Sequence, residues 1–361
     1  MGKIKYRLLV IMGYIGAVIG AGFASGQEIV QFFVTYGLYG LKGAIVATVL
    51  FAILGGMLLF VAHQQKVSSY QDLLVHLFGT KTAALIDFSL AIFLFLGIST
   101  MLSASGAVFA EHLSLSKYLG ILFAYGLVIM FLLMGKRGLV LSFNLLVPIK
   151  LLLLIIITTY AAFFIENDQI AIYTAFLSSA DIKFWALSSI LYVAYNFALA
   201  LVVLTEYQSL TDKKGGIAGG IWGGLLLGLL VIFNFLALSK FLPVILHYEV
   251  PMLYIAEHIS LTTKHLYTVV LWLGILTTAL ANTYGFAQRI SKFIGLNYKI
   301  TLIICLTLAL PIATQSFSVL VGKIYPMFGV LGLIIILALV KKAIKDIVRE
   351  LYYNITQWKK R

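Results

Sequence analysis

The sequence has little charge and a large excess of apolar residues. Charged residues make up 11% of its 361 positions, whereas residues of the hydrophobic class make up 62%, and the mean hydropathy is +1.05. A soluble domain typically carries about 25% charged residues. The chain therefore cannot cover its surface in water, and we expect most of its exterior to face the hydrocarbon of a lipid bilayer.

Cysteine and the common catalytic motifs are also scarce. The single cysteine, Cys305, excludes an internal disulfide and a metal site built from several cysteines. It stands in an apolar run, so we interpret it as a packed thiol. The sequence contains no H-E-x-x-H, G-x-S-x-G or G-x-x-x-x-G-K-[ST] motif, so nothing favours intramembrane hydrolysis or the use of ATP. We expect no enzyme, no bound metal and no organic cofactor.

Apolar runs separated by charged or turn-like segments predict about ten membrane-spanning helices. A span needs about 20 mostly apolar residues, and a helix satisfies its own backbone hydrogen bonds in lipid. The approximate cores are 8–35, 41–62, 83–110, 119–134, 139–165, 184–206, 217–238, 266–288, 300–314 and 318–340. Three stretches between spans are candidates for short helices: 63–82, 166–183 and 239–265. The fold class is all-α, with one transmembrane domain over 1–340 and no soluble domain.

The placement of the basic residues predicts the orientation of the chain. The net charge is +13, but the basic residues stand between apolar runs, which argues against a nucleic-acid partner. The N-terminus, the tail and every second loop hold 19 Lys and Arg, whereas the opposite loops hold five. Cytoplasmic loops carry this excess, so both termini are predicted to be cytoplasmic in a bacterial inner membrane. The basic, amphipathic tail at 341–361 is expected to lie at the membrane surface.

The first span is unusually rich in glycine. Five glycines occur in GYIGAVIGAGFASGQEIVQFF, which begins at residue 13. They could serve close helix packing through G-x-x-x-G spacing. They could also mark a break near Gly20–Gly26 whose free backbone N–H groups bind a substrate carboxylate at the bilayer midplane. The polar residues at 25–28 favour the break, because packing alone does not need them. The predicted carboxylate-binding residues are Gly20, Ala21, Gly22, Ser25 and Gly26.

If the chain consists of two repeats of five spans, at about 8–165 and 184–340, span six corresponds to span one. It reads FWALSSILYVAYNFALALVVLTEYQ from residue 184. A second break near Tyr195–Ala198 would lie opposite the first, and its carbonyls and side chains would receive the substrate amine. A continuous helix with a few interhelical hydrogen bonds fits equally well, since this span lacks glycine and proline. Tyr195 and Asn196 are the candidate ligands.

These features resemble a known superfamily. The glycine-rich first span, the five-plus-five layout and the short length resemble the amino acid–polyamine–organocation superfamily, whose members have the LeuT fold. The segment GAGFASGQEIVQFF most closely resembles the YkvI-like amino acid permeases of bacteria. The likeness covers essentially the whole chain in layout, and its specificity rests mainly on span one. It implies a 5+5 inverted repeat with broken helices 1 and 6, and alternating access around a midplane site between spans one, three, six and eight.

Lys150 stands deep in span five, about eleven residues or roughly 16 Å from the cytoplasmic end. A buried lysine is costly unless it is paired. Proton-coupled and exchanging members of the superfamily carry a lysine in span five whose ammonium replaces a sodium ion, and Lys150 resembles that residue. The resemblance implies sodium-independent, proton-coupled transport. Alternatively, Lys150 forms a salt bridge or reaches water without titrating.

Hydroxyl and amide groups in spans eight and three are further candidates. Span eight contains Thr277, Thr278, Asn282 and Thr283, which could coordinate sodium as in sodium-coupled relatives or bond the Lys150 ammonium. Each hydroxyl could instead bond its own helix backbone, which is common for threonine in a helix. In span three, Ser103 is a candidate substrate ligand with the same ambiguity.

Glu28 and Lys323 form a candidate outer gate. In LeuT-like transporters an opposite-charge pair joins spans one and ten, with the basic partner in span one; here the signs are reversed, and the role is correspondingly open. In the alternative, Glu28 meets the substrate amine or carries a proton, and Lys323 snorkels to the interface.

The sequence as a whole predicts a secondary active transporter that moves an amino acid or similar small zwitterion, with a proton or Na⁺ as the coupling ion. The alternative is a nutrient-sensing receptor subunit of the same fold, which would need partner proteins because the loops are too short for a signalling domain. An ion channel is disfavoured, since there is no filter-like sequence or repeated acidic ring.

Overall fold

The computed structural model describes residues 2–67, 69–133, 151–166 and 169–358, and these ranges contain helices but no β-strand. A helix or a set of helices occupies each of the ten predicted spans. In order they are α1 (Gly2–Val18) with α2 (Ala21–Ser25) and α3 (Gln27–Phe32), α4 (Leu38–Gln65), α6 (Thr80–His112), α7 (Lys117–Leu132), the helix Leu151–Phe164, α11 (Trp185–Glu206), α12 (Lys213–Ser239), α14 (Leu261–Ile294), α15 (Tyr298–Ala313) and α16 (Phe317–Trp358). Six of them, α4, α6, α11, α12, α14 and α16, are long and apolar enough by themselves to cross a membrane.

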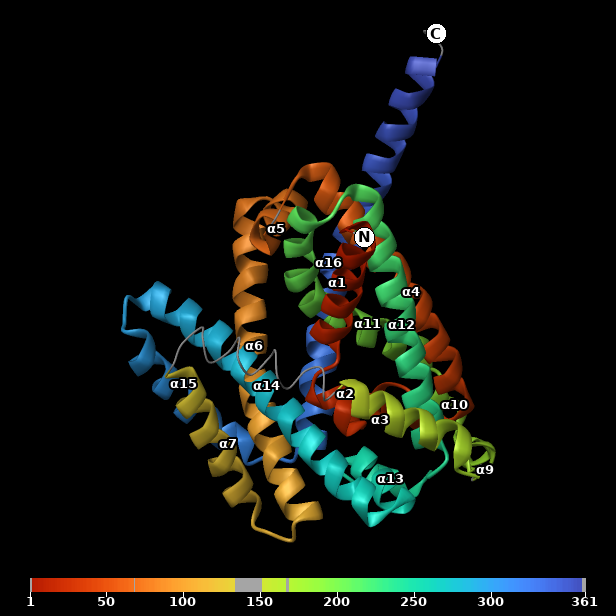
Figure 1. Cartoon of the computed structure of the whole chain (residues 1–361), viewed down its shortest axis with the longest axis vertical. Helices are drawn as coiled ribbons and strands as arrows, with labels where there is room; N and C mark the ends of the chain where they lie inside the picture. The colour runs from red at the N-terminus through yellow and green to blue at the C-terminus, as the bar shows by residue number, and fades with distance from the viewer. Residues whose placement is uncertain (1, 68, 134–150, 167–168, 359–361) are drawn as a thin grey trace.

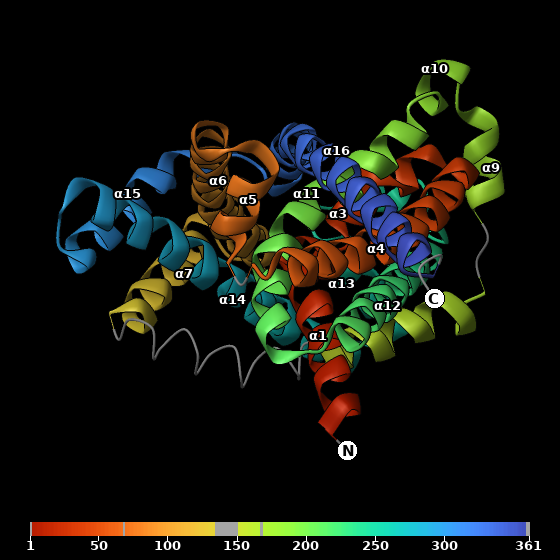
Figure 2. The same cartoon turned by 90° about the horizontal axis from the view of Figure 1, so that it is seen from above.

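The spans pack in two groups, which Figure 2 shows side by side. Spans one, two, six and seven form one group, in which α12 packs on α4 and α1, and α11 packs on α4. Spans three, four, eight and nine form the other, in which α6 contacts α7, α14 and α15. Each group combines corresponding spans of the two halves of the chain, as expected for a 5+5 repeat.

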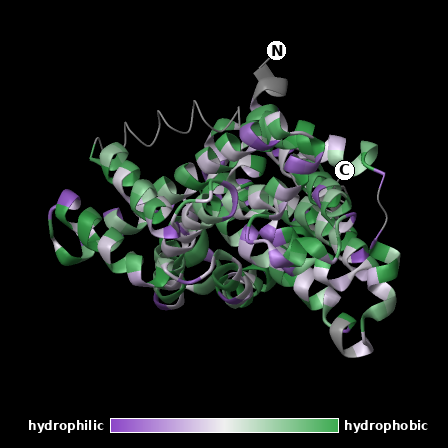
Figure 3. Ribbon diagram, turned by 90° about the horizontal axis from the view of Figure 1, so that it is seen from below, coloured by the Kyte–Doolittle hydropathy of each residue, from purple (hydrophilic) through white to green (hydrophobic). Residues whose placement is uncertain are grey.

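The short helices predicted between the spans are present in all three stretches. They are α5 (Tyr70–Phe78), α9 (Ile170–Phe176), α10 (Ser179–Ile182), the 3₁₀ turn η3 (Val244–His247) and α13 (Pro251–Ile259); the 3₁₀ turns η1 (Val34–Tyr36) and η2 (Tyr207–Leu210) extend spans one and six. Apolar residues dominate the helices at the perimeter (Figure 3). Many are exposed, as on α15, where Ile300, Ile304 and Leu308 are 45–61% exposed and would face lipid.

Span six is one continuous helix, so the predicted second break near Tyr195–Ala198 is wrong. α11 runs from Trp185 to Glu206 without interruption. Ser189 and Asn196 bond the backbone of their own helix, and the amide of Asn196 donates to the carbonyl of Tyr192 at 3.0 Å. Ser188 instead donates to the carbonyl of Phe32 in span one at 2.8 Å. Without glycine or proline, nothing in this span pulls a carbonyl out of the helical ladder.

The tail continues the last span. α16 crosses residue 340 and extends to Trp358, and Figure 1 shows it projecting from the end of the bundle where both termini lie. Its first polar turns are held to the bundle: Gln65 donates to Asp346 at 2.7 Å, and Lys213 forms an ion pair with Glu350 at 2.8 Å.

Candidate functional site

The break predicted in span one is confirmed. α1 ends at Val18, two residues intervene, and α2 begins at Ala21. A second interruption follows at Gly26, whose φ of +81° separates α2 from α3. A side chain at Gly26 would be strained at that φ, and its Cβ would lie 2.9 Å from the Cγ of Met252. Glycine is therefore needed for the turn that the sequence places there.

Side chains from other spans satisfy backbone carbonyls at the end of α2. The amide of Asn234 on α12 donates to the carbonyl of Phe23 at 3.2 Å, and the hydroxyl of Tyr267 on α14 donates to that of Ala24 at 2.5 Å. A broken helix inside a membrane requires such partners, because lipid offers none.

A cavity of about 620 Å³ lies against this break. Glu28, Tyr195 and Tyr325 line its buried end, and each is at most 6% exposed. Glu206 and Lys292 line its mouth and are exposed. The end of α11 that carries Glu206 lies at the same end of the bundle as α5 and the two termini (Figure 1), and Tyr70 and Gln71 of α5 also line the cavity. The cavity thus opens toward the side predicted to be cytoplasmic.

Most of the predicted site residues meet in this cavity. Its lining includes Gly20, Ala21, Gly22, Glu28, Tyr195, Asn196, Thr277, Thr278 and Asn282. Ser25, Gly26, Ser103, Thr283 and Lys323 do not line it. Lys150 lies outside the described residues.

Several of the predicted polar ligands have a local partner instead of facing a ligand. Ser25 donates to the carbonyl of Gly22 at 2.8 Å, and the hydroxyls of Thr277 and Thr278 donate to the carbonyl of Gly274 on their own helix. Ser103 joins span three to the segment before α16, because it donates to the backbone carbonyl of residue 315 at 2.6 Å. Within the described ranges, the buried hydroxyl of Thr283 and the Oε2 atom of Glu28 have no hydrogen-bond partner.

The predicted ion pair between Glu28 and Lys323 is not formed. Lys323 is exposed on α16, and no salt bridge joins it to Glu28 in the described part of the chain. A Cβ built on the adjacent residue, Gly322, would lie 3.3 Å from Oε1 of Gln31 on α3. The next position of α16 is therefore turned about 100° away from α3. The Glu28 carboxyl instead lies over Gly22 in α2.

A polar cluster near the cavity mouth was not predicted from the sequence. Arg289 on α14 forms an ion pair with Asp87 on α6 at 3.1 Å, and the hydroxyl of Tyr70 on α5 donates to the same carboxylate at 2.7 Å. The guanidinium also lies 5.4 Å from the centre of the Tyr70 ring. These contacts bind the short helix α5 to the rim of the cavity.

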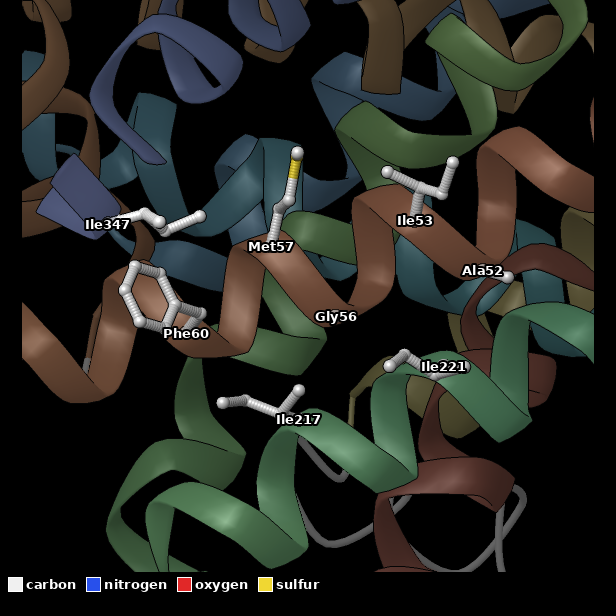
Figure 4. A pocket seen from close by; sticks show the side chains of 8 residues that line it. All are labelled: Ala52, Ile53, Gly56, Met57, Phe60, Ile217, Ile221 and Ile347. Carbon is white, nitrogen blue, oxygen red and sulfur yellow. The ribbon is translucent and has the colours of Figure 1, made fainter. Parts of the chain in front are cut away.

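A second cavity, of about 360 Å³, lies between α4, α12 and the Ile347 region of α16 (Figure 4). Aliphatic and aromatic side chains such as Ile53, Met57 and Ile221 line it, and no charged side chain does. It offers nothing that would recognise a polar solute.

The end of the bundle remote from the termini is closed by α13 and the loop before it. Met252 on α13 packs against the Gly26 turn of span one. Glu111, at the end of α6, accepts hydrogen bonds from the backbone N–H groups of Glu249 and Val250 at 2.8 and 3.3 Å. Glu249 in turn accepts from the N–H of Phe317, the first residue of α16. Two carboxylates thus fasten the closing segment to spans three and ten.

Replacing Glu249 should loosen this closure. In a Met252→Cys reporter, which is buried in the closed state, Glu249→Ala should raise the rate of labelling by a membrane-impermeant maleimide about tenfold, the effect of losing one charged hydrogen bond. Glu166→Ala, at an exposed side chain outside the closing segment, is the matched control and should leave the rate unchanged. Equal labelling rates with and without Glu249 would show that this side chain does not hold the closing segment in place.

The pH dependence of that labelling has a defined sign. Burial, and then the neighbouring Glu111, raise the pKa of Glu249, although the Phe317 amide and Lys117 oppose the shift. A carboxyl with a raised pKa in the closed state adds stability that is complete below its ordinary pKa and lost as the pH rises through the raised value. Labelling of Met252→Cys, divided by the labelling rate of a free thiol at the same pH, should therefore increase with external pH. Glu249→Gln should remove this remaining dependence.

A bundle of membrane helices with a broken first span in the wall of a one-ended cavity has the fold of a membrane transporter. Solved structures with this fold include a manganese transporter of Eremococcus coleocola in complex with an aromatic bis-isothiourea substituted compound. The two share 14% identity over 91% of this chain and 76% of the transporter, with a TM-score of 0.59. A mutant form of the same transporter gives a TM-score of 0.56 over the same shares.

The chain belongs to the family of the uncharacterized membrane protein YkvI of Bacillus subtilis (strain 168). It is 30% identical to that protein over 331 residues, which are 91% of this chain and 94% of YkvI. The uncharacterized protein YyaD of the same organism is 25% identical over 359 residues, 98% of each chain. No protein-family model matches the chain.

Proposed function

We propose that the chain is a secondary active transporter of an amino acid or similar small zwitterion that works by alternating access in a bacterial inner membrane. The observation that carries the proposal is the interrupted first span in the wall of a cavity that is open at one end and closed at the other. With both termini in the cytoplasm, this arrangement corresponds to an inward-facing state. Membership of the amino acid–polyamine–organocation superfamily is part of the same proposal.

The size and chemistry of the cavity support a small zwitterion. Its volume of about 620 Å³ is in the usual range for small-molecule sites. The broken backbone at Gly20–Gly22 lies beside a buried carboxyl group, Glu28. A site for a substrate carboxylate and a site for a substrate ammonium group are therefore close together. Asn196, Thr278 and Asn282 add further polar groups to the wall.

A divalent metal ion, the cargo named for the manganese transporter, fits this cavity less well. Hard divalent cations take several oxygen ligands, usually including more than one carboxylate. The described residues contain no group of three or more His, Cys, Asp or Glu side chains that could hold a metal ion. The two carboxylates that line the cavity, Glu28 and Glu206, belong to its buried end and its mouth.

Uptake by purified protein in sealed vesicles tests the proposal. We expect at least one labelled L-amino acid to accumulate to a higher level in these vesicles than in vesicles without protein. Labelled Mn²⁺ should not. Binding of an amino acid without accumulation would favour the alternative of a nutrient-sensing receptor subunit. Accumulation of Mn²⁺ alone would overturn the substrate class.

Coupling to protons through Lys150 is a separate prediction. An imposed pH gradient, acidic outside, should drive uptake in the absence of sodium, and Lys150→Ala should abolish that response because the titrating ammonium is lost. Exposed Lys299 provides a matched control, Lys299→Ala, which should keep it. Sodium-dependent uptake that survives Lys150→Ala would contradict the proposal.

A further inference from the structure

The continuous form of span six raises the question of what receives the substrate amine. The carbonyls expected to do so remain in the helical ladder of α11, and that of Tyr192 also accepts from the Asn196 side chain. A protonated amine in a cavity closed to water at one end needs an acceptor, because an unpaired buried charge is very costly. The acceptor must therefore come from another element.

We propose that Glu28, enclosed by the rings of Tyr195 and Tyr325, is the binding site for the ammonium group of the substrate. This inference rests on the proposed function and specifies which group of the cavity recognises which end of the solute. Glu28 is 4% exposed and lines the buried end of the cavity. Its Oε2 has no hydrogen-bond partner, and no basic side chain lies within ion-pair distance of it, in the part of the chain that the structure describes.

The surroundings of Glu28 suit a cation. The Tyr195 ring lies 4.9 Å from that of Tyr325 and 5.7 Å from that of Tyr192, measured between centroids. All three phenols interact electrostatically with Glu28. A carboxylate supplies a charged hydrogen bond to an ammonium group, and aromatic faces attract the same cation.

Other polar groups surround this place. The hydroxyl of Tyr195, which lines the cavity, interacts with the Glu28 carboxyl. The buried hydroxyl of Tyr192 makes no hydrogen bond among the described residues but does not line the cavity. Buried polar groups are normally satisfied, so the carboxyl oxygen left open at the buried end of the cavity indicates a missing ligand. An ammonium group, with three N–H donors, could satisfy it.

The backbone of span one places Glu28 next to the break. The Gly26 turn starts α3, and Glu28 in its first turn lies back over α2. A Cβ built on Gly22 would be 2.0 Å from Oε1 of Glu28, so the carboxyl rests directly on the Cα of Gly22. A solute with its amine and carboxylate on one carbon can therefore contact Glu28 and the broken backbone together. This favours α-amino acids over amino acids with distant charges.

Ligand-induced thermal stabilisation of the purified full-length protein tests the proposal. The probes are the twenty common L-amino acids, followed by the deaminated acid and the decarboxylated amine of the strongest binder. We expect the amino acid and the amine to bind and the deaminated acid not to bind. Glu28→Gln should weaken amino acid binding about 30-fold or more, since it removes one partner of a buried charge pair.

Matched variants separate recognition from folding. Glu28→Asp keeps the charge and should retain part of the affinity, whereas Glu257→Gln on the exposed face of α13 should bind as the wild type does. Glu28→Gln is nearly the same size as the native residue, and its elution as a single species in detergent will show that it folds.

The possible outcomes test the role of Glu28 separately from the proposed transport function. Unchanged affinity in Glu28→Gln, or equal binding of the deaminated acid, would overturn the amine site. A Glu28→Gln protein whose binding lost only its pH dependence would also overturn it, because Glu28 would then be a proton carrier. Binding of no amino acid by the wild type would overturn the amine site and the proposed substrate together. Binding with the expected Glu28 dependence but no uptake into vesicles would contradict transport and leave the amine site standing.

Discussion

Gly224→Ala should prevent α4 and α12 from packing and should remove most of the folded protein. A Cβ on Gly224 would lie 2.4 Å from the backbone carbonyl atoms of Phe51, and no side-chain rotation can relieve a contact with backbone. The same interface brings Gly55 and Gly220 together, where a Cβ on Gly220 would lie 2.4 Å from the Gly55 oxygen. The helices would have to separate along their length, at a cost of about 3 kcal/mol or more.

The measurement is the yield of monodisperse protein in mild detergent and its midpoint of thermal unfolding. Gly126→Ala on α7 is the matched control, because a Cβ there meets nothing within 4 Å. That change should be neutral or slightly stabilising, since alanine favours helix over glycine by up to about 1 kcal/mol. A Gly224→Ala protein as stable as Gly126→Ala would show that the two backbones are not in contact.

Gly22→Ala should abolish uptake while leaving the protein folded. The added methyl group would lie 2.0 Å from the Oε1 atom and 2.9 Å from the Cγ atom of Glu28, so the carboxyl must leave its place at the break. Since that side chain is buried, its displacement changes the end of the cavity that we expect to hold the substrate. We expect initial uptake into vesicles to fall by about tenfold or more, with little change in the unfolding midpoint.

Gly126→Ala on α7 is the matched control. Its Cβ would meet nothing within 4 Å, and Gly126 does not line the cavity. Uptake by this variant should stay within about twofold of the wild type, as for a substitution that makes no new contact. Equal loss in both variants would indicate that uptake is lost with any added methyl group, rather than that Gly22 and Glu28 are coupled.

The membrane class, the number of spans and the break in span one could be predicted from the sequence because each depends on local composition. Apolar length predicts a span wherever the helix finally packs. The glycines of span one predict a break because Gly26 takes a backbone conformation that other residues avoid. These features need no knowledge of distant residues.

Span six shows where such reasoning stops. Its serines, tyrosines and asparagine are compatible with a broken helix that binds a solute and with a whole helix that bonds itself. The Asn196 side chain donates to the carbonyl one turn earlier, and α11 stays intact. Whether the helix breaks depends on which hydrogen-bond partners surround each side chain, and the residue types alone do not specify those partners.

Pairs that join distant segments were also missed. Arg289 bonds Asp87 across 202 residues, and Glu111 bonds the N–H of Glu249 across 138. In the sequence these appeared as scattered charges, and Arg289 contributed only to the count of basic residues in a loop. Conversely, Glu28 and Lys323 looked like partners by analogy, but adjacent positions on α16 face in different directions.

The sequence by itself determined that this is a membrane protein with about ten spans and a broken first span. Each of these features follows from local residue types, because a span requires a long apolar segment and the break requires glycine. Only the tertiary structure decided that span six stays whole, that one end of the cavity is closed, and that Glu28 lies beside the break without a basic partner in the described ranges. The physical reason is that the cost of a buried polar group depends on which atoms surround it, and those atoms come from segments far apart in the chain.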